Sequence, residues 1–461
     1  MSVERTLADQ FADFVINQRF EEIPEVVLMR AKLLMLDAVG IAYASSQQEF
    51  AQRTLNALAT FGDGDGRVIG MPAKLALRDA VLLNGLLIHG LDYDDTYLPG
   101  SVHLSSSCAS TALGMAASVG ASGRALLVAY VLGLEIGARL GAAGSGAFLR
   151  AGFHATSMAG TFASTLIASR LMDMTRAQAV MAQGVALSTV SGTMQPMQDG
   201  SWTKRMHPGW SGVCGITAAT LAKQGFVGPT EPYEGRFGLF TCFLGEHTAL
   251  ADLSMATNRL AEHWEFQRTS IKLYPVCHQS HAFMNAAIKI RLAHAIDAAQ
   301  VASIHVLVAA PAVPLICEPL AEKRRPDSSY AAQFSLPYNI ACCLMRGSFG
   351  MAELAESSYG NPQMRDLASK MTYAIDPNSG FPKTRSGEVL VTMNNGEVYQ
   401  CREEINPDEP ADAESIITKF MDNAAMAIAP ARAKTVRDLI LGLEEVADAR
   451  AVMRLLSGGF D

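Results

Sequence analysis

The feature of this 461-residue sequence that most constrains its fold is a polar segment between two apolar stretches. The segment runs from His89 to His103 and contains three aspartates. It follows an apolar stretch, 80–88, whose periodicity predicts a buried helix, and a stretch of small residues, 105–123, comes after it. Because an unpaired charge inside a protein costs several kcal/mol, these groups must reach solvent or find partners. The segment therefore predicts either a solvated loop or a functional site.

Four further segments combine polar side chains with a turn: 152–157, 199–210, 271–281 and 332–338. The histidines in or beside the five polar segments are His89, His103, His154, His207, His278 and His281. The cations that accompany them are Lys204, Arg205 and Lys272. A set of this kind binds carboxylates through charge-assisted hydrogen bonds and transfers protons near neutral pH. The pattern favours a site for a small anion.

A metal site is the alternative use of His89 with Asp92, Asp94 and Asp95. The segment lacks the turn glycine and the distal glutamate of a calcium loop. Leu98 stands where the magnesium pattern of helical terpenoid synthases needs an aspartate, and the lysines of the other segments disfavour a cation. We therefore expect no metal.

Nucleophilic catalysis has less support in the sequence. The eight cysteines show no CxxC spacing, and no G-x-S-x-G elbow is present.

The cysteines are read as reduced thiols, and the N-terminus lacks the pattern of a secretory signal, so a cytoplasmic protein is expected.

Charge and hydropathy exclude two classes of partner. The formal net charge of −8 offers no electrostatic support for binding nucleic acid or an anionic membrane. The apolar stretch 125–140 is interrupted by Glu135 and Arg139, which argues against a membrane span. Any anionic ligand must therefore be bound by a local cluster of cations.

Two kinds of pattern divide the chain. Apolar residues at helical spacing occur in 5–19, after Pro24 and throughout 77–223, and again in 416–426 and 431–456. The stretch 62–66 is interpreted as a connecting turn. Between these regions lie a predicted strand, 301–309, a helix, 331–346, and a hairpin, 388–400, around Asn394-Asn395-Gly396. The prediction is a mainly α protein. A large all-helical domain, 1–267 with 404–461, is formed by both chain ends, and a smaller α+β lid domain, 268–403, is inserted near the C-terminal end.

At these polar segments the sequence resembles the MmgE/PrpD family. The motifs that carry the resemblance are HGLDYDDT with a later VH, GFHATS, SWTKRMHPGW, IKLYPVCH and FSLPY, which spread from residue 89 to 338. The family includes 2-methylcitrate dehydratase, cis-aconitate decarboxylase and iminodisuccinate epimerase. The resemblance implies a helical domain with an α+β lid, an active site between them, a homodimer, and no metal or organic cofactor.

Matching the family motifs to this chain assigns the site residue by residue. The resemblance implies catalytic roles for Asp92, His103, His154, Lys204 and Lys272, and substrate-binding roles for Thr96 and His278. The substrate would be a small di- or tricarboxylate. The expected activity is that of a hydro-lyase on a 2-methylcitrate-like tricarboxylate, with decarboxylation or epimerisation as alternatives.

A non-enzymatic helical binding protein is the competing interpretation. In that case the histidines would satisfy buried backbone groups at scattered places, and no common site would form. The distances among His103, His154, Lys204 and Lys272 therefore distinguish the two interpretations.

Overall fold

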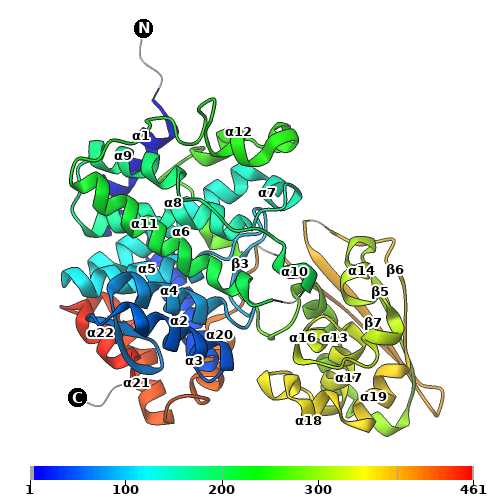
Figure 1. Cartoon of the computed structure of the whole chain (residues 1–461). Helices are drawn as coiled ribbons and strands as arrows, with labels where there is room; N and C mark the ends of the chain where they lie inside the picture. The colour runs from blue at the N-terminus through cyan, green and yellow to red at the C-terminus, as the bar shows by residue number, and fades with distance from the viewer. Residues whose placement is uncertain (1–4, 200, 382, 407, 459–461) are drawn as a thin grey trace. The chain divides into compact units, whose positions relative to one another are not determined.

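The computed structural model describes residues 5–199, 201–381, 383–406 and 408–458. The chain divides into two compact units (Figure 1). The helical unit comprises Met1–Ile271 and Ala411–Asp461, and the α+β unit comprises Lys272–Pro410. The predicted fold class is confirmed, because a large helical unit is formed from both ends of the chain and a smaller α+β unit is inserted near the C-terminal end.

The helical unit contains most of the chain's long helices and several helices of four to six residues. They are α1 (Leu7–Asn17), α2 (Glu25–Ser46), α3 (Glu49–Leu58), α4 (Leu77–His89), α5 (Leu104–Val119), α6 (Gly123–Gly144), α7 (Ala147–Arg150), α8 (Ala155–Leu171), α9 (Arg176–Leu187), α10 (Pro196–Asp199), α11 (Thr203–Lys223), α12 (Leu239–Leu244), α20 (Ala413–Ala424), α21 (Pro430–Leu441) and α22 (Ala449–Leu456). Helix α8 packs against α5, α6, α9 and α11.

Small residues let the central helices approach closely. A Cβ atom built on Gly85 of α4 would lie 2.5 Å from the Cα of Gly209 in α11, which is closer than real Cβ atoms come. At Gly160 of α8 it would lie 2.5 Å from the Oγ of Ser107 in α5. Glycine at these positions therefore sets the distance between the helices whose ends build the site described below.

Helix α6 is the one described helix that is long and apolar enough to cross a membrane, and 94% of its apolar window is buried inside the protein. Two of its charged residues are paired, with the Nε of Arg139 2.6 Å from Oε1 of Glu135. Arg139 also donates to the carbonyl oxygens of Asn258 and His263 at 2.8 and 2.7 Å. These contacts identify α6 as a core helix of the helical unit.

A buried ion pair joins helix α20, near the C-terminal end of the chain, to helix α2, near the N-terminal end. Helix α20 packs on α2, where the Nζ of Lys419 lies 2.6 Å from Oδ1 of Asp37. Both side chains are almost fully buried. The pair, together with the apolar contacts of α20, explains why both chain ends belong to one unit.

Two predicted helices are interrupted in the structure. The stretch 431–456 forms α21 and α22 around a turn at 442–448, where the side chain of Asp448 caps the second helix. The stretch 331–346 forms α16 (Ser329–Gln333) and α17 (Leu336–Arg346), because Ser335 caps a new helix that has Pro337 in its first turn. Helical periodicity continued across both caps and concealed the breaks.

The prediction of a connecting turn at 62–66 is also only partly correct. Gly66 begins a short strand, β1 (Gly66–Val68), which pairs antiparallel with β2 (Met71–Leu75). Two other short strands, β3 (Thr96–Tyr97) and β4 (Thr269–Ser270), pair with each other, so that Thr96 lies opposite Ser270. Strands of two to five residues are too short to show a period.

The α+β unit is built on one four-stranded mixed sheet of order β6-β5-β7-β8. Its strands are β5 (Val301–Val308), β6 (Met371–Ile375), β7 (Arg385–Met393) and β8 (Val398–Ile405). Strand β5 runs parallel to β6 and antiparallel to β7. The predicted strand at 301–309 and the hairpin are confirmed, and Gly396 supplies the positive φ of the hairpin turn.

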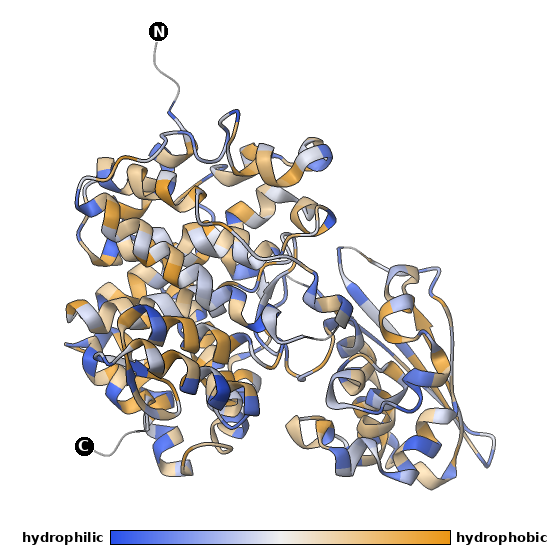
Figure 2. Ribbon diagram, viewed as in Figure 1, coloured by the Kyte–Doolittle hydropathy of each residue, from blue (hydrophilic) through white to orange (hydrophobic). Residues whose placement is uncertain are grey.

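Helix α13 (His281–His294) covers β7 and β8 of the sheet, and α17 packs against α13. The shorter helices are α14 (Val313–Ile316), α15 (Leu320–Lys323), α18 (Glu356–Tyr359) and α19 (Pro362–Ser369). The buried apolar residues form one hydrophobic core in each unit. Figure 2 shows apolar residues along the helices of both units and polar residues in the turns between them.

Candidate active site

Most of the polar segment at 89–103 is buried or half-buried in the helical unit. His89 is the last residue of α4 and is 1% exposed, and Asp94 is completely buried. The Nδ1 of His89 lies 2.8 Å from Oδ2 of Asp94. The buried carboxylate thus orients the imidazole at the end of α4.

His103 is held at the other end of the segment. It is the residue before α5, and its backbone N–H donates to Oγ1 of Thr156 at 3.0 Å. Its Nδ1 lies 2.9 Å from the carbonyl oxygen of Asp95 and 3.3 Å from Oδ1 of Asp94. The hydroxyl of Thr96 is 3.4 Å from the same nitrogen. Since Nδ1 faces these acceptors, Nε2 is the nitrogen of His103 that is available to a ligand.

His154 takes the corresponding position before α8. Its backbone N–H donates to the carbonyl oxygen of Gly192 at 3.0 Å, and its side chain is buried. Its Nδ1 lies 3.1 Å from Nδ1 of His207, a residue of α11. One of these two nitrogens carries the proton, so the two histidines have complementary tautomers.

Lys204 stands in the first turn of α11 and pairs with Asp92. The Nζ of Lys204 donates to Oδ1 of Asp92 at 2.9 Å. Asp92 has a φ of 50°, in the left-handed region, which aspartate adopts more readily than most residues other than glycine.

Three of the imidazoles form a compact cluster, which we call the histidine cluster: His89, His103 and His154. The ring centroids of His89 and His103 are 4.7 Å apart, those of His89 and His154 5.5 Å, and those of His103 and His154 6.1 Å. Residues from three different helix ends therefore meet within the reach of one small ligand.

Burial decides the charge state of His89, His154 and His207. Burial lowers the pKa of His89 to about 4, against the opposing effect of the Asp94 charge. Burial, and then the nearby charge of Lys204, hold the pKa of His154 well below its ordinary value. The same two causes lower the pKa of His207 to about 4. These imidazoles are neutral at pH 7 and can accept a proton or donate a hydrogen bond.

The two neighbouring aspartates differ in their charge. Burial would raise the pKa of Asp94, but its contacts with His89 and His103 outweigh burial and hold that pKa well below the ordinary value. Burial, and the charge of Asp94, raise the pKa of Asp95 to about 7, although Ser105 donates to it through its hydroxyl and its backbone N–H. Asp94 is thus the ionised partner of the histidines.

Three helix N-termini meet around the cluster. His103 precedes α5, His154 precedes α8, and Lys204 lies in the first turn of α11. The N-terminal end of a helix carries a partial positive charge and unpaired N–H groups, which favour anions. Lys204 and these helix ends are local groups that favour an anion in a protein whose net charge is −8. The arrangement suits a ligand that carries carboxylates.

The loop between His89 and Thr96 is fixed from two sides. The Nζ of Lys419 in α20 donates to the carbonyl oxygen of Tyr93 at 3.0 Å and lies 3.8 Å from the centre of the Tyr93 ring. The Nε of Arg205 donates to the carbonyl oxygen of Gly90 at 2.8 Å. The returning C-terminal segment thus supports the site through the backbone of this loop.

The sequence-predicted residues fall into two groups. Asp92, Thr96, His103, His154 and Lys204 come together in the helical unit, as described above. Lys272 and His278 belong to the α+β unit. His278 begins a short 3₁₀ turn and its ring lies 4.7 Å, centre to centre, from that of His281. Roles for Lys272 and His278 stay predictions from the resemblance.

Three residues of the cluster and its surroundings were not assigned to the site from the sequence: His89, Asp94 and His207. Each was visible within a polar segment. His207 follows Lys204 by three residues, which places both on one face of α11. Asp94 lies between Asp92 and Thr96 but gave no local sign that it would pair with two histidines.

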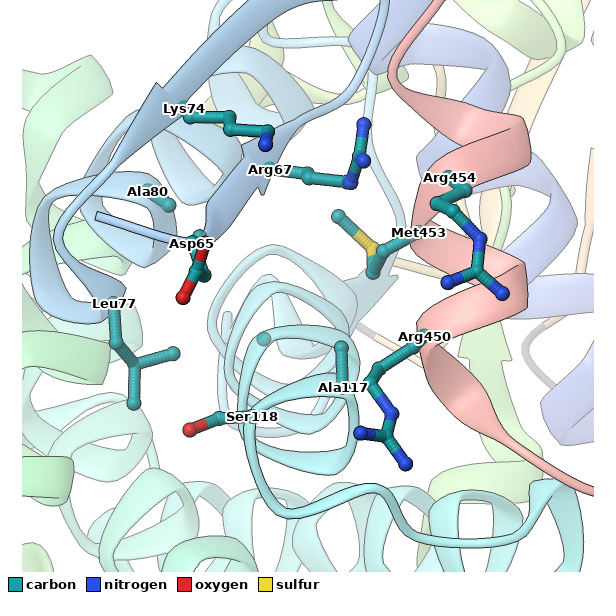
Figure 3. A pocket seen from close by; sticks show the side chains of 12 residues that line it. Asp65, Arg67, Lys74, Leu77, Ala80, Ala117, Ser118, Arg450, Met453 and Arg454 are labelled. Carbon is teal, nitrogen blue, oxygen red and sulfur yellow. The ribbon is translucent and has the colours of Figure 1, made fainter. Parts of the chain in front are cut away.

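A separate cavity of about 440 Å³ lies elsewhere in the helical unit (Figure 3). Its lining includes Arg67, Lys74, Arg450 and Arg454, with Asp65, but none of the histidines. In Figure 3 the guanidinium groups of Arg450 and Arg454 point away from Arg67 and Lys74, and Arg450 is paired with Asp448. The cations therefore do not converge on one ligand position.

The chain matches known proteins along nearly its whole length. The MmgE/PrpD N-terminal domain matches residues 9–250, and the MmgE/PrpD C-terminal domain matches residues 274–445. Cis-aconitate decarboxylase of Aspergillus terreus is 26% identical, over 98% of this chain and 96% of that protein. Cis-aconitate decarboxylase of Homo sapiens is 23% identical over 98% and 95%, and that of Mus musculus is 23% identical over 98% and 94%.

Proposed function

The chain belongs to the MmgE/PrpD family, and from this we propose that it is a lyase that acts on a small di- or tricarboxylate without a metal or organic cofactor. The observation that carries the proposal is the meeting of the N-terminal ends of α5, α8 and α11 around the histidine cluster and Lys204. The buried, neutral imidazoles of His89 and His154, beside one ammonium group and three helix N-termini, suit anionic substrates and proton transfer.

The chemistry requires a bond next to a carboxylate to break. In a decarboxylation, the bond that breaks joins a substrate carbon to a second carboxylate. CO2 leaves, and the electron pair of that bond stays on the substrate. A proton from the enzyme then takes up this electron pair. The carbon carries carbanion character until it is protonated. Fixed cations and N–H dipoles in a water-poor site favour this charge.

Each residue of the site has a role in this proposal. Lys204 and the helix N-termini bind substrate carboxylates. His103 and His154 present Nε2 toward the substrate and transfer the proton, while Thr96 donates a hydrogen bond. Asp92 orients Lys204, while the catalytic role of Lys272 and the substrate-binding role of His278 stay predictions from the resemblance.

Decarboxylation is the reaction that we favour. The relatives compared above carry the name cis-aconitate decarboxylase, and they span the chain from end to end. The dehydration of a 2-methylcitrate-like tricarboxylate, expected from the sequence, and the epimerisation of iminodisuccinate use the same kind of carboxylate clamp and acid–base groups. These two reactions stay alternatives for the assay. The homodimer and the cytoplasmic location expected from the sequence likewise remain predictions.

One set of assays with the purified full-length protein distinguishes the three reactions. Cis-aconitate, 2-methylcitrate and iminodisuccinate are supplied separately, and released CO2, alkene absorbance and optical rotation are followed. The proposal expects CO2 from cis-aconitate at a rate that exceeds any turnover of the other two. Formation of alkene from 2-methylcitrate without CO2 would favour the hydro-lyase instead. No turnover of any of the three would contradict the proposed substrate class.

A further inference from the structure

His207 pairs with His154, the third ring of the histidine cluster. The Nδ1 atoms of the two rings are 3.1 Å apart, and the ring centroids are 5.2 Å apart. One proton lies between the two Nδ1 atoms, because two bare nitrogen lone pairs at this distance would repel each other. Both side chains are buried, and Nε2 of His154 has no hydrogen-bond partner within the described part of the protein. A buried nitrogen without a partner is costly, so this atom is available to a ligand.

The backbone around the pair holds the two rings against each other. His154 directly precedes α8, and His207 lies near the start of α11. The backbone N–H of His154 donates to the carbonyl oxygen of Gly192 at 3.0 Å, and a Cβ atom built on Gly192 would lie 3.3 Å from Cγ of His207. Gly192 has a φ of 112°, a conformation that glycine adopts without strain. One loop therefore contacts both members of the pair.

The proposed decarboxylation consumes one proton for each CO2 released. A tricarboxylate with three negative charges leaves all three on the remaining fragment, so a dicarboxylate forms only when a proton joins the carbon. Burial, and then the charge of Lys204, lower the pKa of His207 to about 4 and hold the pKa of His154 well below its ordinary value. Delivery of a proton from a neutral ring would leave a buried imidazolate, which is costly. The pair must therefore acquire its proton in the substrate complex.

We propose, resting on the proposed function, that His207 is a positioning residue that works with His154 as one acid. When the anionic substrate binds, the two rings together take up one proton from the solvent. His154 then delivers a proton from Nε2 to the substrate carbon, and the electron pair of the broken C–C bond forms the new C–H bond. The proton between the rings remains on Nδ1 of His154, so that both rings are neutral again.

The charges around the pair explain why the proton arrives only with the substrate. After burial, the groups that oppose a positive charge on His154 are Lys204, His89 and His103. The nearby carboxylates are already in contact with these groups: Asp92 with Lys204, and Asp94 with His89 and His103. Substrate carboxylates add negative charge in a water-poor site, and this charge favours an imidazolium beside them.

His207 supplies the partner that this imidazolium needs. Protonated His154 carries a proton on Nδ1, and Nδ1 of His207 accepts a charge-assisted hydrogen bond from it. Without an acceptor at this place, a charged N–H group would be buried unpaired. A lone His154 would therefore take up the proton only at lower pH.

Proton uptake is measured by calorimetry with the full-length protein. Tricarballylate, a saturated tricarboxylate, is titrated in buffers with different enthalpies of ionisation, and the slope of the binding enthalpy gives the number of protons taken up. At about pH 7 we expect an uptake of about one proton per bound ligand by the unaltered protein. His207→Phe keeps a ring but removes both nitrogens, so it should bind tricarballylate and take up almost no proton.

The kinetics of CO2 release from cis-aconitate supply a second readout. His207→Phe should lower kcat by about 10- to 100-fold with little change in KM, because the acid is weakened while Lys204 still binds carboxylate. His207→Asn places an amide where Nδ1 stood and should recover part of kcat. Its kcat should fall on the alkaline side at a lower pH than that of the unaltered protein, since the amide cannot share the charge.

His247→Phe is the matched control, because His247 is a partly exposed histidine of the same unit, 3.9 Å from Glu246. It should match the unaltered protein in both measurements. Binding without proton uptake, or equal uptake by His207→Phe and His247→Phe, overturns the inference, assigns the proton to the ammonium group of Lys204, and leaves the proposed function intact. Absence of both tricarballylate binding and CO2 release overturns the two together. If His207→Phe fails to fold by circular dichroism, the proton counts of the unaltered protein and His207→Asn decide.

Discussion

The Nζ of Lys204 donates a hydrogen bond to Oδ1 of Asp92 over 2.9 Å, although 112 positions separate the two residues. Asp92 belongs to the turn after α4, and Lys204 belongs to the first turn of α11. The contact joins two polar segments that are far apart in the chain. It also positions the one lysine that faces the histidine cluster within the described helical unit.

Replacing Lys204 by methionine tests this placement. Lys204→Met keeps the length of the side chain but removes its charge, and with it the clamp for a substrate carboxylate. We expect kcat/KM to fall by about 100-fold or more, the usual effect of losing one preorganised donor to a developing charge.

Lys223→Met is the matched control for this variant, because Lys223 is an exposed lysine at the other end of the same helix. Steady-state kinetics with cis-aconitate should leave this control near the unaltered rate. Equal activity of Lys204→Met and Lys223→Met would exclude Lys204 from the site.

Asp94 acts as a positioning residue for two imidazoles. Asp94→Asn retains the shape of the side chain but replaces the acceptor that holds Nδ1 of His89 and His103. We expect kcat to fall by about 100-fold or more, because the rings lose their tautomer and orientation, while KM changes much less. Asp79→Asn, in the first turn of α4, should change neither constant. A rise in KM with unchanged kcat would assign Asp94 to substrate binding instead.

The ion pair between Lys419 and Asp37 should contribute strongly to stability. Lys419→Met leaves Asp37 buried without its cation and removes the donor to the carbonyl oxygen of Tyr93. Breaking a buried pair from one side typically costs about 3 to 5 kcal/mol. Chemical denaturation followed by circular dichroism should show this loss in the free energy of unfolding.

Two further variants decide the origin of that effect. Lys434→Met, at an exposed position of α21, should stay within about 0.5 kcal/mol of the unaltered protein. The double variant Asp37→Leu with Lys419→Leu should recover part of the stability, since it leaves no buried charge unpaired. If the double variant is less stable than Lys419→Met, packing rather than the unpaired carboxylate accounts for the loss.

The stability of the α+β unit should fall in acid partly because of Asp376. Burial would raise the pKa of this carboxyl, but hydrogen bonds from Arg402, the Asn378 backbone and Ser386 outweigh burial and lower it below the ordinary value. A folded-state pKa below the unfolded-state pKa stabilises the protein at any pH above the unfolded value. This contribution is lost as the pH falls through the folded-state pKa.

Asp376→Asn provides the measurement. The difference in free energy of unfolding between the unaltered protein and this variant should be largest near about pH 7 and should shrink as the pH falls from about 4 toward 3. Asp366→Asn removes an exposed partner of Lys370 instead and should show a small difference at every pH. A gap that widens in acid would contradict the assigned direction of the pKa shift.

Much of the fold could be predicted from sequence patterns alone. The period of the apolar residues predicts α1 and α2, and β-branched residues with Asn394-Asn395-Gly396 predict β5 and the hairpin of β7 and β8. The patterns missed the breaks before α17 and α22, because apolar spacing continued across the caps at Ser335 and Asp448. Because a cap is a local hydrogen bond, it does not change the spacing of the apolar residues from which helices are predicted.

The sequence by itself determined which segments are polar amid apolar ones, and which residue types those segments offer. Polarity alone marks these segments, because charged and imidazole groups beside buried helices require a reason. Within them, Asp92, Thr96, His103, His154 and Lys204 were singled out by the resemblance to the MmgE/PrpD family. Only the tertiary structure decided that His207 contacts His154, that Asp94 holds two rings, and that Lys419 supports the loop from the far end of the chain. Partner choice, tautomer and charge depend on distance and on exclusion from water. Both arise only when helices far apart in sequence pack together.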